Sequence, residues 1–328
     1  MNILVYDVAA ESGGAVSVLD YYYDIHKEDK DNHYYYLLGT YKKPQTENIT
    51  VLNYPKVKIG WIYRLIFDYI KAPRIIKELK IDTVLSLQNT VIPRYKGYQT
   101  VYMHNILPFS EYRYSLFEDK LMWIYQNIIG RFIYSSMKKA DHIIVQAGWI
   151  KTAIESRIPE SKGKIEVQFP QVSISHEFHY IDGNYRKFFY PANFAPFKNH
   201  RVIVEAARLI KDKHIGDYEI IFTLNGNETQ KVAELKQQCI SENLPIKWVG
   251  YLSRNIVYKT YTESILLFPS YIETIGLPLY EAKKIGSPIV AANLAYAHEV
   301  LDDYEKKHYF DWKSAHQLSV IMMEMLEN

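Results

Sequence analysis

Short apolar runs alternate with helical patterns along the whole chain, and this alternation limits the fold more than any other feature. Runs such as NILVYDV (2–8) and SILLFPS (264–270) are nearly continuous in apolar residues. Continuous apolar runs of this length are typical of parallel strands that are buried on both faces. Strands that alternate with helices therefore predict an α/β fold, in which a parallel sheet is covered by helices on both sides.

The first half of the chain contains six such runs, with helical patterns between them. We expect strands at 2–8, 33–39, 49–54, 82–88, 99–105 and 142–147. In two intervening stretches, apolar residues recur at the spacing of one helix face. They are Ile62, Leu65, Ile66, Tyr69 and Ile70 in the first stretch, and Leu121, Ile124, Tyr125, Ile128, Ile129 and Phe132 in the second.

The second half repeats the plan, with strands expected at 187–193, 219–226, 246–251, 264–270 and 287–293 and helices at 199–212, 228–242, 254–263 and 277–285. A length of 328 residues also suggests about two domains. The polar, aperiodic stretch 171–186 is the expected linker between Rossmann-like domains at 1–170 and 187–328. Two doubly wound domains predict a cleft, with ligands bound beyond the carboxyl ends of the strands.

Composition narrows the function classes. A 48% hydrophobic chain with 23% charged residues is globular, and a net charge of +2 gives no support for a nucleic-acid partner. The single cysteine, Cys239, excludes a disulfide within the chain and fits a reducing compartment. The N-terminus does not read as a signal peptide, and the most apolar stretch is interrupted by Arg64 and Asp68. We expect a cytoplasmic protein, either soluble or resting on the inner face of the cytoplasmic membrane.

Two strand ends in the first half carry candidate site residues. Gly13 and Gly14 follow the first strand, where paired glycines allow a tight turn and a close approach to a ligand. Paired glycines in such a turn more often reflect plain turn chemistry. His104 ends the strand at 99–105, where it can donate a hydrogen bond to a substrate hydroxyl or phosphate. A lone histidine is also commonly a structural residue.

In the second half, Lys198 follows the strand at 187–193 and precedes a helix for which Asn199 is the expected N-cap. A lysine beside a helix N-terminus suits phosphate, because a point charge and the helix dipole act together. The alternative is an ordinary solvated lysine.

The stretch SYIETIGLPLYEAKKIG (270–286) contains the most informative pattern. Proline is favoured in the first turn of a helix, so Leu277 and Pro278 indicate a helix start, and Gly276 permits a ligand to approach its free N–H groups. Glu273 precedes this helix and Glu281 lies about one turn inside it. Paired carboxylates accept hydrogen bonds from sugar hydroxyls, although two glutamates exposed on the surface would give the same sequence.

These residues resemble a known family. Glu273 and Glu281, with TIGLPLY between them, resemble the E-x7-E signature of glycosyltransferase family 4, whose members have the GT-B fold. FFYPANFAPFKNHRVIVEAARLI, FTLNGNE, IKWVGYLSR and SPIVAANLAYAHEVL are similar to successive elements of that family's donor domain. The resemblance covers nearly the whole chain and is most specific over 187–301.

The resemblance implies a retaining transfer of a sugar from a nucleotide-diphosphate sugar, without a metal or other cofactor. By position, Glu273 would bind the hydroxyls of the donor sugar and Glu281 those of the ribose. The remaining assignments are Lys198, Gly276 and Leu277 at the diphosphate, His104 near the reacting carbon, Gly13 and Gly14 at phosphate or acceptor, and Thr274 and Asn193 in the donor set.

One position departs from the family pattern. Many members carry Gly-Arg before the donor-domain lysine, whereas this chain has Pro191-Ala192-Asn193, so phosphate would depend on Lys198, backbone dipoles, Arg254 or Lys259. The missing arginine keeps open a catalytically silent nucleotide-sugar-binding protein that acts as an assembly partner. A Rossmann-type epimerase is disfavoured because no GxGxxG motif follows the first strand.

The first domain is expected to bind the acceptor. Residues 55–80 hold seven Lys or Arg against two acids, interleaved with aromatics, which fits an anionic bilayer surface. A domain helix with a basic outer face is the alternative. Together with the resemblance, this segment suggests a lipid-linked saccharide acceptor of bacterial surface polysaccharide or lipopolysaccharide synthesis.

Overall fold

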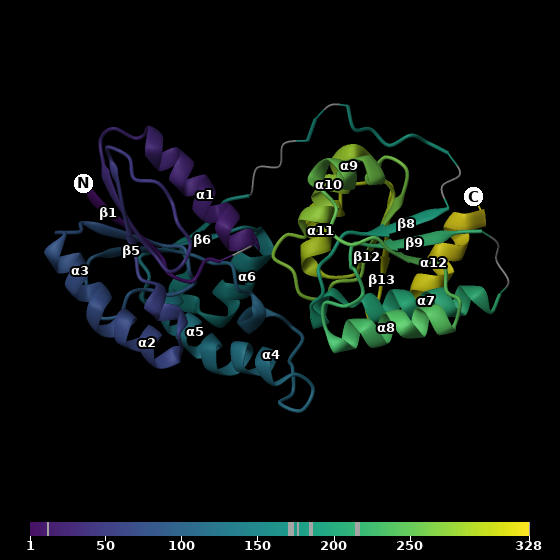
Figure 1. Ribbon diagram of the computed structural model, residues 1–328, viewed down its shortest axis with the longest axis horizontal. Helices are drawn as coiled ribbons and strands as arrows, with labels where there is room; N and C mark the ends of the chain where they lie inside the picture. Colours follow the sequence, from purple (N-terminus) through teal and green to yellow (C-terminus); the bar gives the residue numbers. More distant parts are fainter. Residues whose placement is uncertain (12, 170–173, 176, 184–185, 214–216, 328) are drawn as a thin grey trace. The chain divides into compact units, whose positions relative to one another are not determined.

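A computed structural model describes residues 1–11, 13–169, 174–175, 177–183, 186–213 and 217–327. The chain divides into two compact units, Met1–Phe169 and Pro170–Asn328, and each is built around one parallel sheet (Figure 1). The doubly wound α/β architecture expected from the sequence is confirmed in both units. Residues 171–173, 176 and 184–185 of the expected linker lie outside the described residues. In its described part, the N–H of Tyr180 donates to the carbonyl of Ile285 in unit 2, at 2.7 Å.

The sheet of unit 1 has the order β3-β2-β1-β4-β5-β6-β7, with every neighbouring pair parallel. The chain leaves β1 toward one edge and returns to pair β4 on the other side of β1, so the direction of winding reverses between these two strands. The strands are β1 (Asn2–Asp7), β2 (His33–Leu38), β3 (Ile49–Asn53), β4 (Thr83–Ser86), β5 (Tyr98–Tyr102), β6 (His142–Val145) and β7 (Ile165–Val167).

Helices cover both faces of this sheet, because successive side chains of a strand point to opposite faces. Leu4 and Tyr6 of β1 join a buried cluster that contains residues from the Trp61–Glu78 region, and Val5 joins a second cluster with residues of α1. The helices are α1 (Gly13–Glu28), α2 (Trp61–Ile66), the π-helical turn η2 (Phe67–Lys71), α3 (Ala72–Glu78), α4 (Lys120–Ile124), the π-helical turn η4 (Tyr125–Ile129), α5 (Gly130–Lys139) and α6 (Gly148–Arg157), with short 3-10 turns at η1 (Pro55–Lys58), η3 (Leu107–Phe109) and η5 (Pro159–Ser161).

The sheet of unit 2 has the order β10-β9-β8-β11-β12-β13 and is also entirely parallel. Its winding reverses between β8 and β11. Every residue of β11 and β12 is buried, as expected for central strands that are covered on both faces. The strands are β8 (Lys187–Tyr190), β9 (Glu219–Phe222), β10 (Ile246–Trp248), β11 (Ile265–Phe268), β12 (Ile289–Ala292) and β13 (Lys307–Phe310).

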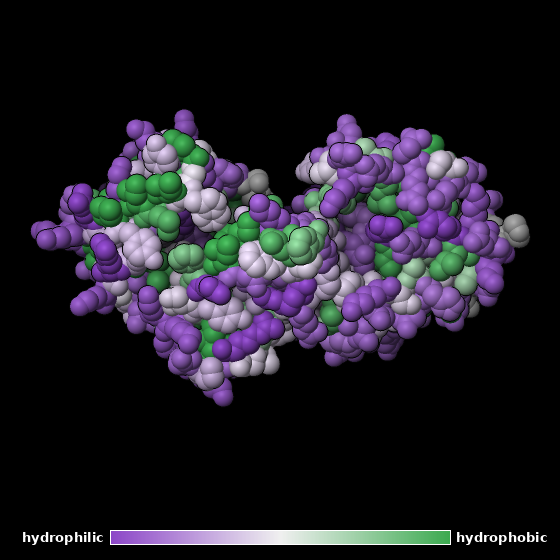
Figure 2. Space-filling model, turned by 90° about the horizontal axis from the view of Figure 1, so that it is seen from below, coloured by the Kyte–Doolittle hydropathy of each residue, from purple (hydrophilic) through white to green (hydrophobic). Residues whose placement is uncertain are grey.

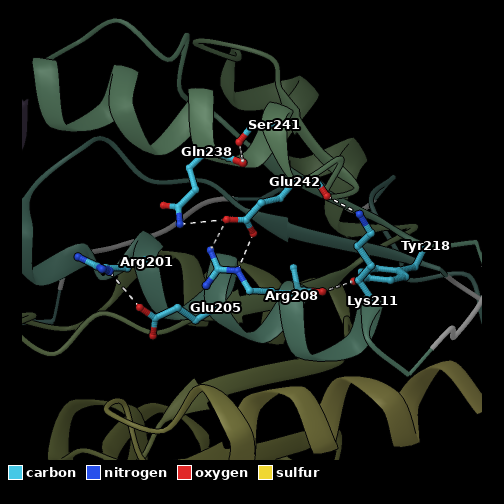
Figure 3. Close-up of polar contacts among 9 residues, drawn as sticks. Arg201, Glu205, Arg208, Lys211, Tyr218, Gln238, Ser241 and Glu242 are labelled. Atoms are coloured by element: carbon cyan, nitrogen blue, oxygen red, sulfur yellow. Dashed lines mark hydrogen bonds and ion pairs between the residues drawn. The ribbon is translucent and has the colours of Figure 1, made fainter.

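In unit 2, α7, α8 and α12 lie on one side of the sheet and α9 and α10 on the other (Figure 1). Arg208 of α7 binds Glu242, just beyond α8, through two N–O contacts of 2.5 and 2.9 Å (Figure 3). The helices are η6 (Pro196–Lys198, a 3-10 turn), α7 (His200–Lys211), α8 (Gln230–Ser241), α9 (Arg254–Tyr261), α10 (Leu277–Ile285), α11 (Ala295–Leu301) and α12 (Ala315–Glu327).

Two sequence interpretations need correction. β7 and β13 were not expected: both are short edge strands whose sequences contain charged residues, so they lack a continuous apolar run. In the apolar stripe expected at 121–132, Leu121, Ile128 and Phe132 are exposed, and the stripe expected to pack at 62–70 also faces outward, since Ile62 is 73% exposed and Leu65 44%. The buried face of this segment is formed by Phe67, Ala72 and Ile75, because η2 rotates the face that meets the sheet.

Candidate functional site

Lys198 and Glu273 meet at the carboxyl ends of two neighbouring strands. Lys198 follows β8 and Glu273 follows β11, and the Lys198 ammonium forms an ion pair with the Glu273 carboxylate. Only 17% of the lysine side chain and 12% of the glutamate side chain are exposed. The hydroxyl of Tyr190, a buried residue of β8, donates to the Lys198 carbonyl at 2.7 Å and fixes the loop.

Sheet order is what brings these two residues together. β8 and β11 are far apart in sequence but adjacent in the sheet, at the point where the winding reverses. The loops beyond them are tied by the Phe197 carbonyl, which accepts from the Tyr271 N–H at 2.9 Å and the Ser270 hydroxyl at 3.1 Å. Open α/β sheets bind ligands at this kind of position.

The start of α10 has the conformation that its sequence predicts. Gly276 is the N-cap, with φ 67° and ψ 62°, and Leu277 and Pro278 are the first two helical residues. A β-carbon on Gly276 would lie 3.2 Å from atoms of Leu279 and Phe268. The fold therefore requires glycine here for two reasons, the left-handed backbone and the packing beneath it. Both reasons are independent of the ligand approach expected from the sequence.

Glu281 lies on α10 and is almost completely buried, with 8% of the residue exposed. The hydroxyls of Tyr258 and Tyr261 on α9 donate to its two carboxylate oxygens at 3.4 and 3.5 Å. Burial raises the pKa of Glu281, and the nearby charge of Arg254 and the two tyrosines oppose that shift. Glu273 and Glu281 thus have different partners: a lysine for the first, and two tyrosines near an arginine for the second.

The two tyrosines were missed by the sequence analysis. Their spacing in YKTY (258–261) places them on one face of α9, which was the available signal. Both cations considered as substitutes for the missing arginine, Arg254 and Lys259, are exposed, and Arg254 lies close enough to Glu281 to lower its pKa.

The other donor-set residues lie in the same loops. Asn193 is exposed in the loop after β8. Thr274 is half-buried beside Glu273, and Leu277 is 37% exposed at the first position of α10. All three therefore lie between the carboxyl ends of β8 and β11 and the helices that follow.

Asn199 differs from what the sequence suggests, and His200 follows it at the start of α7. Asn199 occupies the N-cap position of α7 but has a left-handed backbone, and its side chain does not cap the helix. Its amide donates instead to the Trp312 carbonyl at 2.8 Å. His200 is buried between Tyr190 and Phe222, and neither ring nitrogen has a hydrogen-bond partner in the described part of the chain. Burial and the charge of Lys198 lower its pKa to about 3.

His104 lies in unit 1, directly after β5. Its Nε2 is 2.9 Å from the Leu87 carbonyl, and because a carbonyl only accepts, Nε2 carries the proton. Burial lowers the pKa of His104 to about 4, so the ring is neutral at pH 7 and Nδ1 is an acceptor. The expectation that this ring donates to a substrate needs correction: Nδ1 can only accept a hydrogen bond from one. The side-chain carbonyl of Asn89, a residue not singled out from the sequence, accepts from the backbone N–H of His104 at 2.6 Å.

The sequence suggested a turn at Gly13 and Gly14, but both residues belong to a helix. They are the first two residues of α1, and Gly14 is not among the glycines with positive φ. A β-carbon on Gly14 would meet no atom within 4 Å. A helix position needs no glycine, and the space beside Gly14 is open.

Neither a metal cluster nor a spanning helix is found in the described residues. No group of three or more His, Cys, Asp or Glu among them is placed to hold a metal ion. No described helix combines the length and apolarity that crossing a bilayer requires.

Comparisons with known proteins agree with this architecture. Residues 172–328 match the family described as "Glycosyl transferases group 1". The chain is 23% identical to the O-antigen chain mannosyltransferase RfbU of Salmonella typhimurium over 242 residues. The matched region covers 72% of this chain and 63% of that relative. The chain thus spans less than two thirds of this curated relative.

Two solved structures resemble the full chain. The Anabaena protein Alr3699/HepE, in complex with UDP and glucose, superimposes with a TM-score of 0.68 at 16% identity, covering 100% of this chain and 90% of that one. WaaG, a glycosyltransferase involved in lipopolysaccharide biosynthesis, gives a TM-score of 0.70 at 12% identity, covering 100% and 91%. The two parallel-sheet units are therefore those of the GT-B glycosyltransferase fold, and the second unit matches the group 1 glycosyl transferases.

Proposed function

We propose that this chain is a retaining glycosyltransferase of family 4, which moves a hexose from a nucleotide-diphosphate sugar to a saccharide acceptor. The observation that carries the proposal is the ion pair between Lys198 and Glu273, located where the winding of the second sheet reverses. A half-buried lysine beside a helix start is suited to a diphosphate, and the carboxylate next to it is suited to sugar hydroxyls.

In this proposal, the donor replaces the ion pair of the unliganded protein. Its diphosphate takes over the Lys198 ammonium and the first turn of α10, which frees the Glu273 carboxylate to accept from hydroxyls of the sugar. As the bond to the sugar breaks, negative charge grows on the leaving diphosphate. A preformed cation and helix dipole stabilise that charge, and the proposal requires no metal or other cofactor.

Glu281 is assigned to the ribose hydroxyls. Its carboxylate holds two long hydrogen bonds from Tyr258 and Tyr261, at 3.4 and 3.5 Å. Contacts of this length are weak, so shorter bonds from ribose hydroxyls can replace them at small cost. Arg254, beside this carboxylate, is our candidate for the phosphate contact that the missing arginine provides in the family.

His104 is assigned to the transferred sugar. Its Nδ1 is an acceptor on a neutral ring, so it would accept from a sugar hydroxyl near the reacting carbon. Gly13 and Gly14, in the first turn of α1, are assigned to phosphate or acceptor binding, with open space beside Gly14. We assign acceptor binding to unit 1 as well.

The proposed acceptor is a lipid-linked saccharide used in bacterial lipopolysaccharide or other surface polysaccharide synthesis. RfbU, to which this chain is similar, is an O-antigen chain mannosyltransferase. WaaG, whose fold it shares, is involved in lipopolysaccharide biosynthesis. An intermediate carried by a lipid would be processed at a membrane surface, so the proposal places the protein peripherally on the cytoplasmic face of the membrane.

An apolar, basic surface on unit 1 supports this location. Figure 2 shows hydrophobic residues gathered among polar ones on the face of unit 1 that is seen from below. Around α2 and η2, eight large apolar side chains are exposed: Ile59, Trp61, Ile62, Tyr63, Leu65, Ile66, Tyr69 and Ile70. Lys56, Lys71, Arg74 and Lys77 are exposed in the same segment. We call residues 56–77 the basic–apolar face. Apolar side chains flanked by cations are typical of surfaces that rest on anionic bilayers.

Flotation with vesicles tests the membrane part of the proposal. The protein should float with phosphatidylglycerol vesicles at moderate salt and remain behind with neutral vesicles, because electrostatic attraction supplies part of the binding. Replacing Trp61 and Ile62 with Ser should weaken flotation, whereas exposed Ile240 on α8 offers a matched change outside the face. Absence of flotation would contradict the location.

A catalytically silent nucleotide-sugar-binding protein is the second candidate, favoured by one observation. The loop after β8 reads Pro191-Ala192-Asn193, without the arginine that many family members carry. Both candidates bind a nucleotide sugar, and only the enzyme turns it over.

The test begins with thermal unfolding against a panel of UDP- and GDP-sugars. A donor at a hundred times its dissociation constant stabilises the protein by about 2.7 kcal/mol. The donor that shifts unfolding most is then assayed for hydrolysis and transfer. Turnover that is lost in Glu273→Ala supports the enzyme; binding without turnover supports the silent protein. Unchanged turnover in Glu273→Ala would exclude the proposed site.

A further inference from the structure

A cavity of about 520 Å³ lies within unit 1, inside the basic–apolar face. It opens between the segment that follows β3 and the helical segment α2–η2. Its lining includes Lys56 and Lys71, together with Tyr54, Tyr63, Ile66 and Phe67. A volume of this size is in the range of small-molecule sites, and its walls are largely apolar.

The two lysines give this cavity a single sign of charge. Neither Lys56 nor Lys71 has an acidic partner in the described part of the chain, and no acidic residue lines the cavity. Nearby cations differ: Lys58 pairs with Glu11 at 3.0 Å, and Arg64 pairs with Asp68 at 2.9 Å. The two lysines of the cavity are therefore free to pair with an anionic ligand, as are exposed cations of the same segment outside it, such as Arg74 and Lys77.

One part of the apolar wall is buried, and another part is exposed to solvent. Phe67 is buried at 2% exposure, and its ring packs against Tyr54 with centroids 4.9 Å apart, so it forms a fixed floor. Tyr63 and Ile66 are 50% and 45% exposed, so they form a wall that remains accessible from solvent. This wall continues into the exposed apolar side chains of the basic–apolar face.

Lys71 reaches the cavity because the helix is locally π-helical. The N–H of Ala72 donates to the carbonyl of Phe67, five residues earlier, as a π-helical turn requires. Pro73 follows, and proline cannot make the next N–H bond of an α-helix and crowds the carbonyl of the preceding turn. The extra residue per turn rotates Phe67 inward. π-helical turns of this kind occur frequently at functional sites.

We propose that this cavity binds one lipid molecule by its phosphate end, with the phosphate between Lys56 and Lys71 and the first part of the chain against Tyr63 and Ile66. A phosphate needs cations without partners, and a hydrocarbon chain needs an accessible apolar wall that leads toward a bilayer; the cavity offers both. The lipid we assign is the phosphorylated carrier of the acceptor saccharide, so the inference rests on the proposed function and deepens it.

The experiment measures binding of farnesyl diphosphate, a single-chain lipid diphosphate that can be studied free in solution. Titration calorimetry compares the full chain with a Lys56→Gln/Lys71→Gln variant and with Lys77→Gln, which removes an exposed cation from the same face but outside the cavity. Farnesol and inorganic pyrophosphate are titrated as the two halves of the probe.

We expect farnesyl diphosphate to bind the wild-type chain and Lys77→Gln equally. Loss of each charge-assisted contact should weaken binding about tenfold, so the double variant should lose about a hundredfold. Farnesol and pyrophosphate should each bind far more weakly than the intact probe. Equal binding to the double variant, no binding to wild type, or pyrophosphate binding as tightly as the probe would each overturn the proposal.

Two further arms separate this inference from neighbouring ones. Flotation on phosphatidylglycerol vesicles without any binding of farnesyl diphosphate would also overturn it, because a general anionic surface would then suffice. Nucleotide-sugar binding, measured on the same variants, should be unchanged, since neither Lys56 nor Lys71 is among the residues assigned to the nucleotide sugar. If no nucleotide sugar binds the wild type but the probe still distinguishes the variants, the proposed function fails while the lipid-phosphate cavity stands.

Discussion

The ion pair between Lys198 and Glu273 gives the sharpest test of the site, because stability and activity should respond differently to its removal. Three variants are needed: Lys198→Met, Glu273→Gln and the combination of both. Each single change leaves one charge without a partner in a place where only 12–17% of the original side chains is exposed. The double change removes both charges together.

The magnitude follows from burial. Breaking a fully buried ion pair costs roughly 3–5 kcal/mol, so we expect about 2–3 kcal/mol for each single variant of this slightly exposed pair. The double variant leaves no unpaired charge and should lose only about 2 kcal/mol, which makes the coupling energy about 3 kcal/mol. In melting temperature, each single variant should fall by roughly 4–12 °C for a domain of this size.

Calorimetric unfolding and sugar transfer are measured on all three variants. The free energy of unfolding of the double variant should be higher than the sum of the single effects predicts. The double variant should nevertheless remain inactive, because the diphosphate has lost Lys198 and the sugar hydroxyls have lost the Glu273 carboxylate. Arg208→Gln and Glu242→Gln provide the matched control, since that pair is 36% and 32% exposed and joins α7 to the residue just beyond α8 (Figure 3). Its coupling should stay below about 1 kcal/mol, with activity unchanged.

Two results would refute this reasoning. If the single effects of Lys198→Met and Glu273→Gln add to the double effect within about 0.5 kcal/mol, the two charges are not coupled in the folded protein. If the double variant transfers sugar at the wild-type rate, the two residues are not the donor site.

Three further predictions concern single residues. Gly276→Ala should lower stability by about 1–3 kcal/mol in urea unfolding, because φ is 67° and a β-carbon would lie 3.2 Å from two side chains. Gly14→Ala, where a β-carbon would meet no atom within 4 Å, should be neutral or stabilising. Equal effects of the two substitutions would contradict this. The pKa of Glu281 is raised in the folded state, so the wild-type protein loses stability as pH rises through that pKa. In unfolding measured over a pH series, the stability of Glu281→Gln relative to wild type should therefore grow with pH. A difference that does not change with pH would refute the buried charge. The pKa of His104 is lowered to about 4, so the stability that the neutral ring contributes is present above its ordinary pKa of about 6.5 and is lost on acidification, by about 3 kcal/mol in all. His104→Gln should remove that loss from the acid unfolding curve. An unchanged curve would disprove the prediction.

The fold was largely predictable because burial on both faces leaves a direct trace in the sequence. β11 and β12 are fully buried, and their apolar runs marked them clearly. The bounds of α10 agree with the prediction at both ends, since Gly276 and Gly286 both adopt left-handed conformations that stop a helix. The edge strands β7 and β13 were missed because an edge tolerates charged residues.

What the sequence could not predict depends on contacts between distant segments. The pairing of Lys198 with Glu273 requires β8 and β11 to be neighbours, and the order of strands in a sheet is not written in local periodicity. The proton on Nε2 of His104 depends on the Leu87 carbonyl. The stripe that includes Ile62 and Leu65 shows a further limit, because periodicity defines a helix face but not whether that face meets the sheet or solvent.

The central claim is that a nucleotide sugar binds where the winding of the second sheet reverses. Hydrogen–deuterium exchange, read by mass spectrometry with and without the nucleotide sugar that stabilises the protein most, tests it without relying on turnover. Bound donor should slow exchange in the loop after β8, residues 191–199, and in the segment 270–281 after β11. Donor that stabilises the protein but leaves both segments unprotected, or protects only unit 1, would contradict the account.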